Sequence, residues 1–137
     1  MLRTMLVDDN PLFLAALQKL LATMEGIEVI ATATSAAAAL PEVERLTPDL
    51  VLLDLMMPGM HGLEALRAIR GLPRVPQVVI VTLHDTAEYY HEARRNGALA
   101  LISKHALDEE LRPLVAGLLK PKGDASASLL DKPSVVQ

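Results

Sequence analysis

The sequence contains no cysteine and no tryptophan, and its only aromatic residues are Phe13, Tyr89 and Tyr90. Without cysteine, the chain cannot form a disulfide scaffold, a thiolate nucleophile, or a zinc or iron–sulfur site of the thiolate type. With so few aromatic rings, there is almost no platform on which the bases of single-stranded nucleic acid could stack. These absences exclude disulfide-rich and thiol-dependent domains and disfavour single-strand binders.

An excess of basic charge and a long apolar run are also missing. The net charge is −4 and the pI is near 5.5, the wrong sign for a domain that binds a phosphate backbone. No apolar stretch approaches the roughly 18 residues of a membrane-spanning helix, and the apolar start ends at Asp8, too early for a signal-peptide core. With 137 residues, 51% of them hydrophobic, the chain is predicted to be one soluble globular domain.

Short apolar runs alternate along the chain with segments of helical period. Five strands are predicted, at residues 4–7, 27–32, 50–53, 78–81 and 99–102. Three of the runs are continuously apolar, which is typical of strands covered on both faces of a parallel sheet. The repeated alternation of strand and helix predicts an α/β domain with right-handed crossovers.

Local signals at helix ends and in the tail lead to three further expectations. Pro41 and Pro113 lie inside helical patterns, so the second helix is expected to start late or to kink, and the fifth to kink. The spacing from Asp85 to Glu88 is that of a capping box at the start of the fourth helix. Residues 121–137, rich in proline, serine and alanine, are expected to form a flexible linker or tail after a domain spanning residues 1–120.

Five polar residues follow the predicted strands at their carboxyl ends, where open α/β sheets bind ligands. Asp8 and Asp9 follow the first strand, Asp54 the third, Thr82 the fourth and Lys104 the fifth. Three carboxylates, one hydroxyl and one ammonium are therefore predicted to converge at one edge of the sheet.

Each of these residues alone has an ordinary explanation, as a turn aspartate, a strand-forming threonine or a surface lysine. Three carboxylates packed together repel one another and raise one another's pKa, so the cluster is better explained by a bound cation. The three aspartates and Lys104 sum to −2, which one divalent ion would neutralise. Oxygen ligands without cysteine favour Mg²⁺ over zinc, and the site predicts phosphoryl chemistry on a carboxylate.

Two motifs carry a resemblance to a known family. Residues 5–13 (MLVDDNPLF) and 49–64 (DLVLLDLMMPGMHGLE), followed by Thr82 and Ser103-Lys104, resemble the CheY-like receiver domain of two-component response regulators, in its NarL/FixJ (LuxR-type) branch. The resemblance covers roughly residues 3–119. It implies a flavodoxin-like (βα)5 three-layer sandwich, with a five-stranded parallel sheet in the order 2-1-3-4-5 and the site at the switch between strands one and three.

The resemblance also implies a metal site and a phosphorylation site. Asp54 is implied as the phospho-acceptor. Asp9 and Asp54 would bind Mg²⁺ directly, together with the backbone carbonyl of Met56, and Asp8 would bind it directly or through water. A carboxylate attacking phosphorus, with the charge absorbed by metal and ammonium, agrees with this assignment.

Further roles are implied for residues around the phosphoryl group. Lys104 would pair with one phosphoryl oxygen, and Thr82 would hydrogen-bond another and report its presence. Met56 and His84 flank the expected path of the hydrolytic water. Leu101 stands where the family usually has an aromatic residue or histidine, so a modest shift on strand five is expected. The signal would then be carried mainly by the loop after Thr82 and by the fourth helix.

The resemblance implies a cytoplasmic protein whose partner is a sensor histidine kinase, and which catalyses only its own phosphorylation and dephosphorylation. Phosphorylation would switch the face formed by helix 4, strand 5 and helix 5, with a homodimer as one outcome. The segment itself is not expected to bind nucleic acid or membrane. It would control a DNA-binding module of a longer regulator, or act as a stand-alone receiver through protein contacts.

Two other hypotheses are disfavoured by particular residues. A phosphatase of the haloacid-dehalogenase kind needs a second acid two residues after its aspartyl nucleophile, and that position is Met56. A degenerate receiver that serves only as a binding module would lack Asp54, Lys104 or the acidic pair, and all of these are present.

Overall fold

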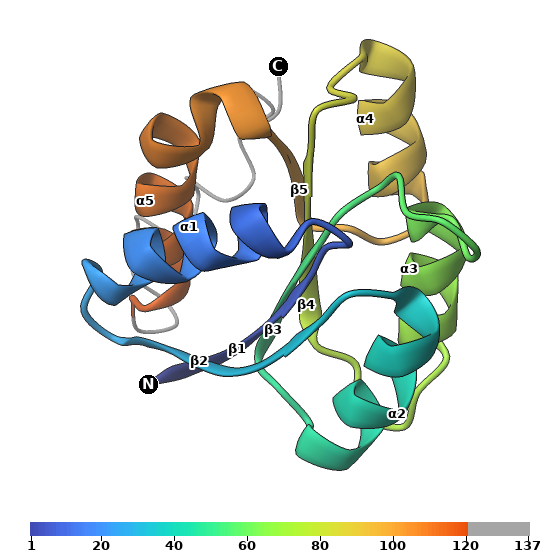
Figure 1. The fold of residues 1–137 in the computed structure, drawn as a ribbon, viewed down its shortest axis with the longest axis horizontal. Helices are drawn as coiled ribbons and strands as arrows, with labels where there is room; N and C mark the ends of the chain where they lie inside the picture. The colour runs from blue at the N-terminus through green and yellow to red at the C-terminus, as the bar shows by residue number, and fades with distance from the viewer. Residues whose placement is uncertain (121–137) are drawn as a thin grey trace.

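The computed structural model describes residues 1–120, and the expectation of a flexible linker or tail over residues 121–137 lies outside the described residues. A five-stranded parallel sheet forms the centre of the domain (Figure 1). Its order is β2-β1-β3-β4-β5, which is the order that the sequence implied. The strands are β1 (Leu2–Val7), β2 (Ile27–Ala33), β3 (Leu50–Leu53), β4 (Gln77–Thr82) and β5 (Ala100–Ser103).

Helices cover both faces of this sheet. α1 and α5 lie on one face, and α2, α3 and α4 lie on the other (Figure 1). A short 3-10 turn, Lys104–Ala106, joins β5 to α5. The helices are α1 (Pro11–Ala22), α2 (Ala36–Leu46), α3 (Gly62–Arg70), α4 (Ala87–Arg95) and α5 (Leu107–Leu118). The resulting three layers confirm the predicted α/β class.

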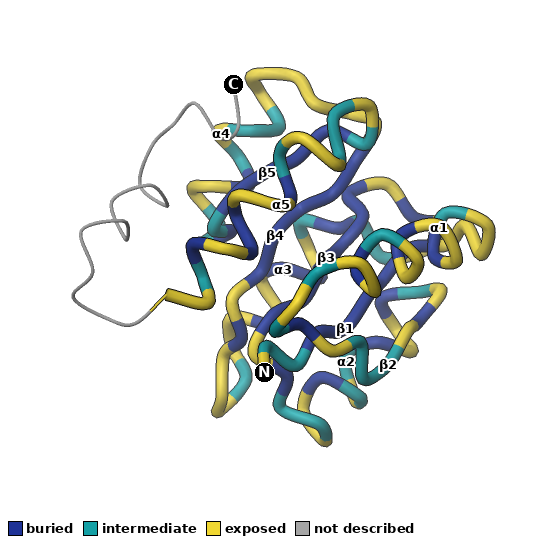
Figure 2. The backbone as a smooth tube through the Cα atoms, turned by 90° about the vertical axis from the view of Figure 1, so that its left-hand side faces the viewer, coloured by how far each residue is buried: buried dark blue, intermediate teal, exposed yellow. Residues whose placement is uncertain are grey.

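The core is centred on the strands that have a neighbour on each side. Every residue of β3 is buried, and so are the last four residues of β1 (Figure 2). β2, at one edge of the sheet, is only partly buried, whereas β5, at the other edge, is buried at every residue. Continuous apolar runs were therefore a correct indication of strands covered on both faces.

At the helix starts, the late start given as one alternative for α2 and the capping box given for α4 were both wrong. α2 does not start late, because Ser35 caps it by accepting a hydrogen bond from the N–H of Ala38, and Pro41 lies inside the continuous helix. The cap of α4 is Thr86, whose hydroxyl accepts from the N–H of Tyr89, one residue later than the capping-box spacing indicated. A side-chain oxygen in an extended residue just before the first turn decided both starts.

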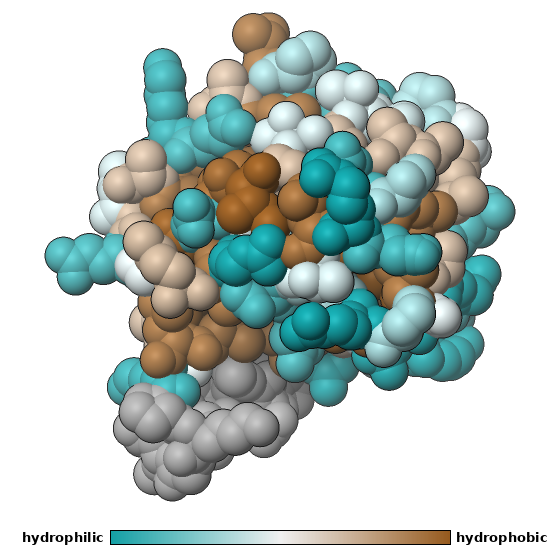
Figure 3. Space-filling view, turned by 90° about the horizontal axis from the view of Figure 1, so that it is seen from below, coloured by the Kyte–Doolittle hydropathy of each residue, from teal (hydrophilic) through white to brown (hydrophobic). Residues whose placement is uncertain are grey.

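The surface carries scattered apolar side chains. In the view from below, apolar areas are broken up by hydrophilic side chains (Figure 3). Among the described residues, no helix is both long and apolar enough to cross a bilayer. The large apolar side chains that are most exposed are Met1, Leu12, Met56, Val75, Leu83 and Leu119.

Candidate functional site

Backbone hydrogen bonds that continue the sheet place two aspartates at its carboxyl edge. The N–H of Asp8 donates to the carbonyl of Ala33 (3.1 Å), and the N–H of Asp54 donates to the carbonyl of Val7 (2.9 Å). β1 and β3 are neighbours in the sheet, so the side chains that follow them are brought together. The fold thus places Asp8 and Asp54 at the topological switch point, where parallel sheets bind ligands.

A close approach by helix α3 fixes the loop that begins with Asp54. The N–H of Gly62 donates to the carbonyl of Leu55 (2.7 Å). A Cβ at position 62 would lie 2.6 Å from the Asp54 carbonyl oxygen and 2.6 Å from the Leu55 Cα. Only glycine fits at such backbone contact, so the start of α3 packs directly on the backbone of this aspartate.

Three carboxylates form the acidic centre of the site. One oxygen from each of Asp8, Asp9 and Asp54 lies within 4.8 Å of the others. Asp8 and Asp54 are buried, with exposed fractions of 2% and 6%, and Asp9 is exposed. The cluster therefore opens to solvent on the side of Asp9.

The ammonium group of Lys104 reaches this cluster from the end of β5. Its Nζ lies 2.6 Å from Asp8 Oδ2 and 3.8 Å from Asp54 Oδ2. The lysine side chain is only 12% exposed, so solvent screens these pairs less than it would at the surface. One cation among three carboxylates leaves an excess of two negative charges.

The pKa of Asp54 reflects both its burial and this excess of negative charge. Burial and the nearby negative charge of Asp8 raise the pKa of Asp54 from 3.8 to about 6, with a smaller contribution from Asp9. The Lys104 ammonium and the backbone N–H of Met56 act in the opposite direction and lower it. Desolvation and like charge outweigh the lysine, so the ionised form of Asp54 is destabilised in the metal-free site.

The two oxygens of Asp8 differ in how they are satisfied. Oδ1 accepts a hydrogen bond from the N–H of Asn10 (2.8 Å), whereas the buried Oδ2 makes no hydrogen bond of acceptable geometry among the described residues. Its contact with Lys104 is therefore an ion pair. A buried carboxylate oxygen whose described partner is a single ammonium group, next to two other carboxylates, fits the oxygen-ligand chemistry of a hard divalent cation.

Thr82 and Leu101, the two residues with an implied switching role, are fully buried behind the acidic centre. The hydroxyl of Thr82 accepts a hydrogen bond from the N–H of His84 (3.1 Å), which holds the start of the loop after β4. Leu101 lies in the middle region of β5, where it pairs with Ile80. Neither residue is among the described ones that line the pocket in front of Asp54.

A pocket of about 230 Å³ lies in front of the acidic centre. Met56 is 39% exposed at its rim, where its Sδ lies 3.1 Å from His61 Nε2. The ring centroid of Tyr89 lies 6.3 Å from that of His61 and 6.2 Å from that of His84. The residues that line the pocket are Asp9, Asn10, Asp54, Met56, Leu83, His84 and Lys104.

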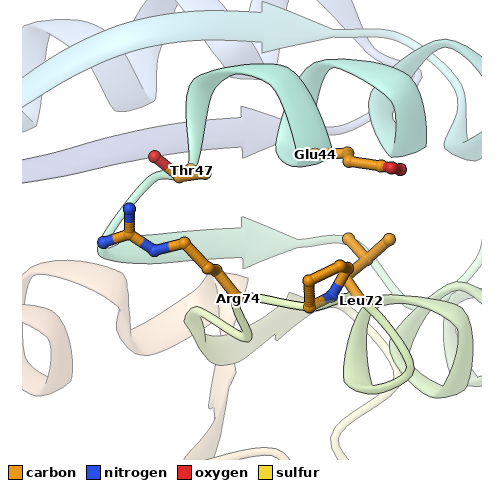
Figure 4. A pocket seen from close by; sticks show the side chains of 5 residues that line it. Glu44, Thr47, Leu72 and Arg74 are labelled. Carbon is orange, nitrogen blue, oxygen red and sulfur yellow. The ribbon is translucent and has the colours of Figure 1, made fainter.

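A second depression lies at the opposite end of the sheet. This pocket, of about 120 Å³, is lined by the end of α2 and the loop after α3. Its two charged side chains, Glu44 and Arg74, extend away from one another (Figure 4). It brings together no cluster of titratable groups, so the candidate site is the one at the carboxyl edge.

Sequence reasoning placed Asp8, Asp9, Asp54 and Lys104 at one edge of the sheet, and the structure brings them together. It missed Phe13, whose ring centroid lies 4.1 Å from Lys104 Nζ. In the sequence, Phe13 stands out only as one of three aromatic residues and as the last residue of the motif over residues 5–13. The sequence offered one signal for a role at the site: Phe13 is the only phenylalanine of the chain and lies four residues after the acidic pair.

The fold and this site define a doubly wound α/β domain with a carboxylate and lysine site at its switch point. Comparison with known proteins agrees with that class. The family model described as response regulator receiver domain matches residues 4–116. The chain belongs to the family of response regulator receiver domains.

Individual relatives give the same result. The chain is 33% identical to the transcriptional regulatory protein MctR of Rhizobium johnstonii over 110 residues, 80% of this chain and 51% of that protein. It is also 33% identical to the oxygen regulatory protein NreC of Staphylococcus haemolyticus over 111 residues, with the same two shares. The chain thus spans about half the length of these curated relatives.

A solved structure supports the fold. The signal receiver domain of NarL from Mycobacterium tuberculosis superposes with a TM-score of 0.78 at 29% identity, covering 85% of this chain and 94% of that one. The flavodoxin-like receiver fold that the sequence implied is therefore confirmed.

Proposed function

We propose that this chain is a phospho-accepting receiver of a two-component system, in which a sensor histidine kinase supplies a phosphoryl group to Asp54. One observation carries the proposal. Asp54 lies in a solvent-accessible pocket, within 4.8 Å of two other carboxylates and 3.8 Å from the Lys104 ammonium. A nucleophilic carboxylate beside acidic metal ligands and a fixed cation is what phosphoryl transfer to aspartate requires.

The proposed step is an in-line displacement on phosphorus. One Oδ of Asp54 attacks the phosphorus atom and forms a new O–P bond. The bond between phosphorus and the donor breaks, and the leaving group departs with its electron pair: the histidine nitrogen of the kinase, or acetate when acetyl phosphate is the donor. The Lys104 ammonium would pair with one phosphoryl oxygen, and the Thr82 hydroxyl would donate a hydrogen bond to another.

The acidic cluster would hold the metal that the reaction needs. Asp9 and Asp54 would bind Mg²⁺ directly with the Met56 carbonyl, and Asp8 would bind directly or through water. Mg²⁺, when bound, supplies positive charge that offsets the carboxylates and the phosphoryl oxygens. The oxygen-only donors and the unsatisfied Oδ2 of Asp8 support this assignment.

The output would follow from the buried residues behind the site. Movement of Thr82 toward the phosphoryl group would release its bond to the N–H of His84 and so rearrange the loop before α4. Leu101 has no ring to rotate, so β5 would shift little, and the loop and α4 would carry the signal. A ligand shifts such an equilibrium only by its differential interaction with the two states.

The setting of the domain is part of the proposal. Residues 1–120 would be the receiver and residues 121–137 a linker or tail, in a cytoplasmic regulator that catalyses only its own phosphorylation and dephosphorylation. The names of the relatives, transcriptional regulator and oxygen regulator, support control of a DNA-binding module in a longer protein. Phosphorylation would alter the α4–β5–α5 face and could form a homodimer, while this segment would not itself bind nucleic acid or membrane.

Mass spectrometry of the intact protein tests the central claim. Incubation with acetyl phosphate and Mg²⁺ should add the mass of one phosphoryl group to the natural protein and none to Asp54→Ala. Equal labelling of both proteins would show that Asp54 is not the acceptor.

A Mg²⁺ titration tests the metal ligands separately. Asp9→Ala should bind Mg²⁺ much more weakly, because it loses a direct carboxylate ligand. Glu28→Ala, which removes an exposed carboxylate from β2, is the matched control and should titrate like the natural protein. An unchanged titration in Asp9→Ala would remove Asp9 from the metal site.

A further inference from the structure

The geometry points to Phe13 as a positioning residue for Lys104 in phosphoryl transfer, an inference that rests on the proposed function. The Nζ of Lys104 lies over the face of the Phe13 ring, 4.1 Å from its centroid. An ammonium group at this distance is attracted by the negative potential of the ring face. Phe13 is half-buried and has no chemistry of its own, so it would act only through the lysine.

Helix α1 fixes the ring under the lysine. Asn10 caps the helix, and its Oδ1 accepts from the N–H of Leu12 (3.0 Å) and of Phe13 (3.3 Å). Phe13 is therefore in the first turn, directly after the acidic loop. The Asn10 N–H in turn donates to Asp8 Oδ1. One capped turn thus sets the positions of the ring and of the carboxylate that flank the ammonium.

Three described groups lie close to the ammonium, and among them only the Phe13 ring keeps the same charge during the reaction. Asp8 Oδ2 is 2.6 Å from Nζ and Asp54 Oδ2 is 3.8 Å away. In the acyl phosphate, the charge of the phosphoryl group would replace the carboxylate charge of Asp54, and Asp8 would share its charge with a bound cation. The attraction from Phe13 stays the same throughout, so the ring keeps Nζ near the phosphoryl oxygens as its ion pairs change.

An aliphatic side chain could fill the same space without this effect. Leucine at position 13 would pack against the lysine stem but would not attract the ammonium. In the resting site Lys104 is closer to Asp8 than to Asp54, so a lysine held only by charge would favour Asp8. The Phe13 ring gives the Lys104 ammonium a further, uncharged contact close to both carboxylates.

Fluorinated phenylalanine tests the attraction directly, because Phe13 is the only phenylalanine in the chain. Growth on monofluoro-, trifluoro- or pentafluorophenylalanine changes this one ring, and each added fluorine weakens the negative potential on its face with little change of shape. The rate of labelling by acetyl phosphate should fall steadily along the series, by about three- to fivefold at its end. A flat series in a protein that is labelled on Asp54 would overturn the role of Phe13.

Fluorine NMR provides a readout without metal or phosphodonor. In the monofluoro protein free of Mg²⁺, Lys104→Met should move the resonance of residue 13, because the charge over the ring is removed. Lys19→Met, on the last turn of the same helix, is the matched control and should leave the resonance in place. If Lys104→Met leaves the resonance unmoved, the ammonium does not lie over the ring and the inference is wrong.

Ordinary variants separate the ring from the stability of the helix. Phe13→Leu should lower the labelling rate by about the same factor as pentafluoro substitution, and Phe13→Tyr should restore it. Leu20→Ala removes a partly buried side chain of the same helix away from the site and should label at the natural rate. A slow Phe13→Tyr protein, or a Phe13→Leu protein as fast as the natural one, would contradict the inference.

The failure of the proposed function is distinguishable from the failure of this inference. If the natural protein is not labelled on Asp54, the proposed function is wrong and the role of Phe13 in it falls as well. If the natural protein is labelled and the fluorinated series is flat, only the role of Phe13 is wrong.

Discussion

At the amino edge of the sheet, Arg3 donates from Nη1 to the carbonyl of Thr47 (2.9 Å) and from Nη2 to the carbonyl of Leu46 (2.8 Å). These carbonyls end helix α2, where a cation is favoured by the helix dipole. The N–H of Arg3 donates to Asp49 Oδ2 (2.8 Å), and the N–H of Asp49 donates back to the carbonyl of Arg3. The charges of Arg3 and Asp49 are thus both matched by hydrogen bonds.

At the carboxyl edge, by contrast, the negative charges are not all matched by a partner. Lys104 is shared between Asp8 and Asp54, one oxygen of Asp8 has no hydrogen bond among the described residues, and the pKa of Asp54 is raised. Taken alone, this arrangement costs stability, because buried like charges repel. This difference is what we expect if the amino edge stabilises the fold and the carboxyl edge serves the proposed binding of a cation and a phosphoryl group.

The largest effect is expected when the cation at the carboxyl edge is removed. Lys104→Met should slow labelling of Asp54 by acetyl phosphate by about a hundredfold, because it removes the fixed charge that faces the phosphoryl oxygens. Arg3→Met is the matched control, since it removes a cation of similar length from the other edge, and it should label at the natural rate. Comparable slowing in both variants would mean that the two edges are not functionally distinct.

The next largest effect is expected when the cation at the amino edge is removed. Arg3→Met should lower the free energy of unfolding by about 2 kcal/mol, because two carbonyls at the end of α2 lose a charged donor. Arg3→Lys should recover only part of this, since one ammonium cannot repeat the fork geometry. Urea denaturation followed by far-ultraviolet circular dichroism measures both. A stability equal to that of the natural protein would show that these hydrogen bonds add little.

A smaller effect sharpens the comparison through pH. The pKa of Asp54 is about 6 in the folded protein and 3.8 in its ordinary state, so the folded form holds a proton that the unfolded form has released between these values. Stability should therefore fall as pH rises from about 4 to 6, and the cost should be fully present above pH 6.

Asp54→Asn removes this cost. In the absence of Mg²⁺ the variant should be about 1–2 kcal/mol more stable at neutral pH, a value reduced from the full shift because the pocket is open to solvent. The gain should vanish below about pH 4, where the natural carboxyl is neutral in both states. Urea denaturation at the two pH values measures it, and a gain independent of pH would contradict the raised pKa.

The smallest expected effect concerns the rim of the pocket. Met56→Ala and His84→Ala should each shorten the lifetime of the phosphorylated protein by about two- to fivefold, because both side chains line the pocket beside Asp54 and would restrict in-line access of water. Val75→Ala, which trims an exposed side chain at the amino edge, is the control. Loss of the label can be followed by intact mass, and unchanged or longer lifetimes in both variants would reject the steric explanation.

Predictions from local sequence succeeded where pairing in the sheet decides the outcome. The apolar run at β3 and the aspartate after it predicted both a buried strand and the position of Asp54 at the carboxyl edge. They were less accurate at the start of α4, where the cap is Thr86 and not Asp85. Pro41 weakens only the middle of α2, and burial of Ala36, Ala39 and Val43 on the sheet stabilises the helix around it.

The sequence by itself determined the order of the elements and the edge at which the acids, Thr82 and Lys104 lie, because parallel strands carry their carboxyl ends to the same side. Only the tertiary structure decided that Lys104 lies closer to Asp8 than to Asp54, that its ammonium rests on Phe13, and that burial raises the pKa of Asp54. The physical reason is the separation along the chain of the residues that decide each feature. The order of strands and helices along the chain follows from short repeating patterns, whereas ion pairing and desolvation depend on side chains that the fold brings together from distant parts of the chain.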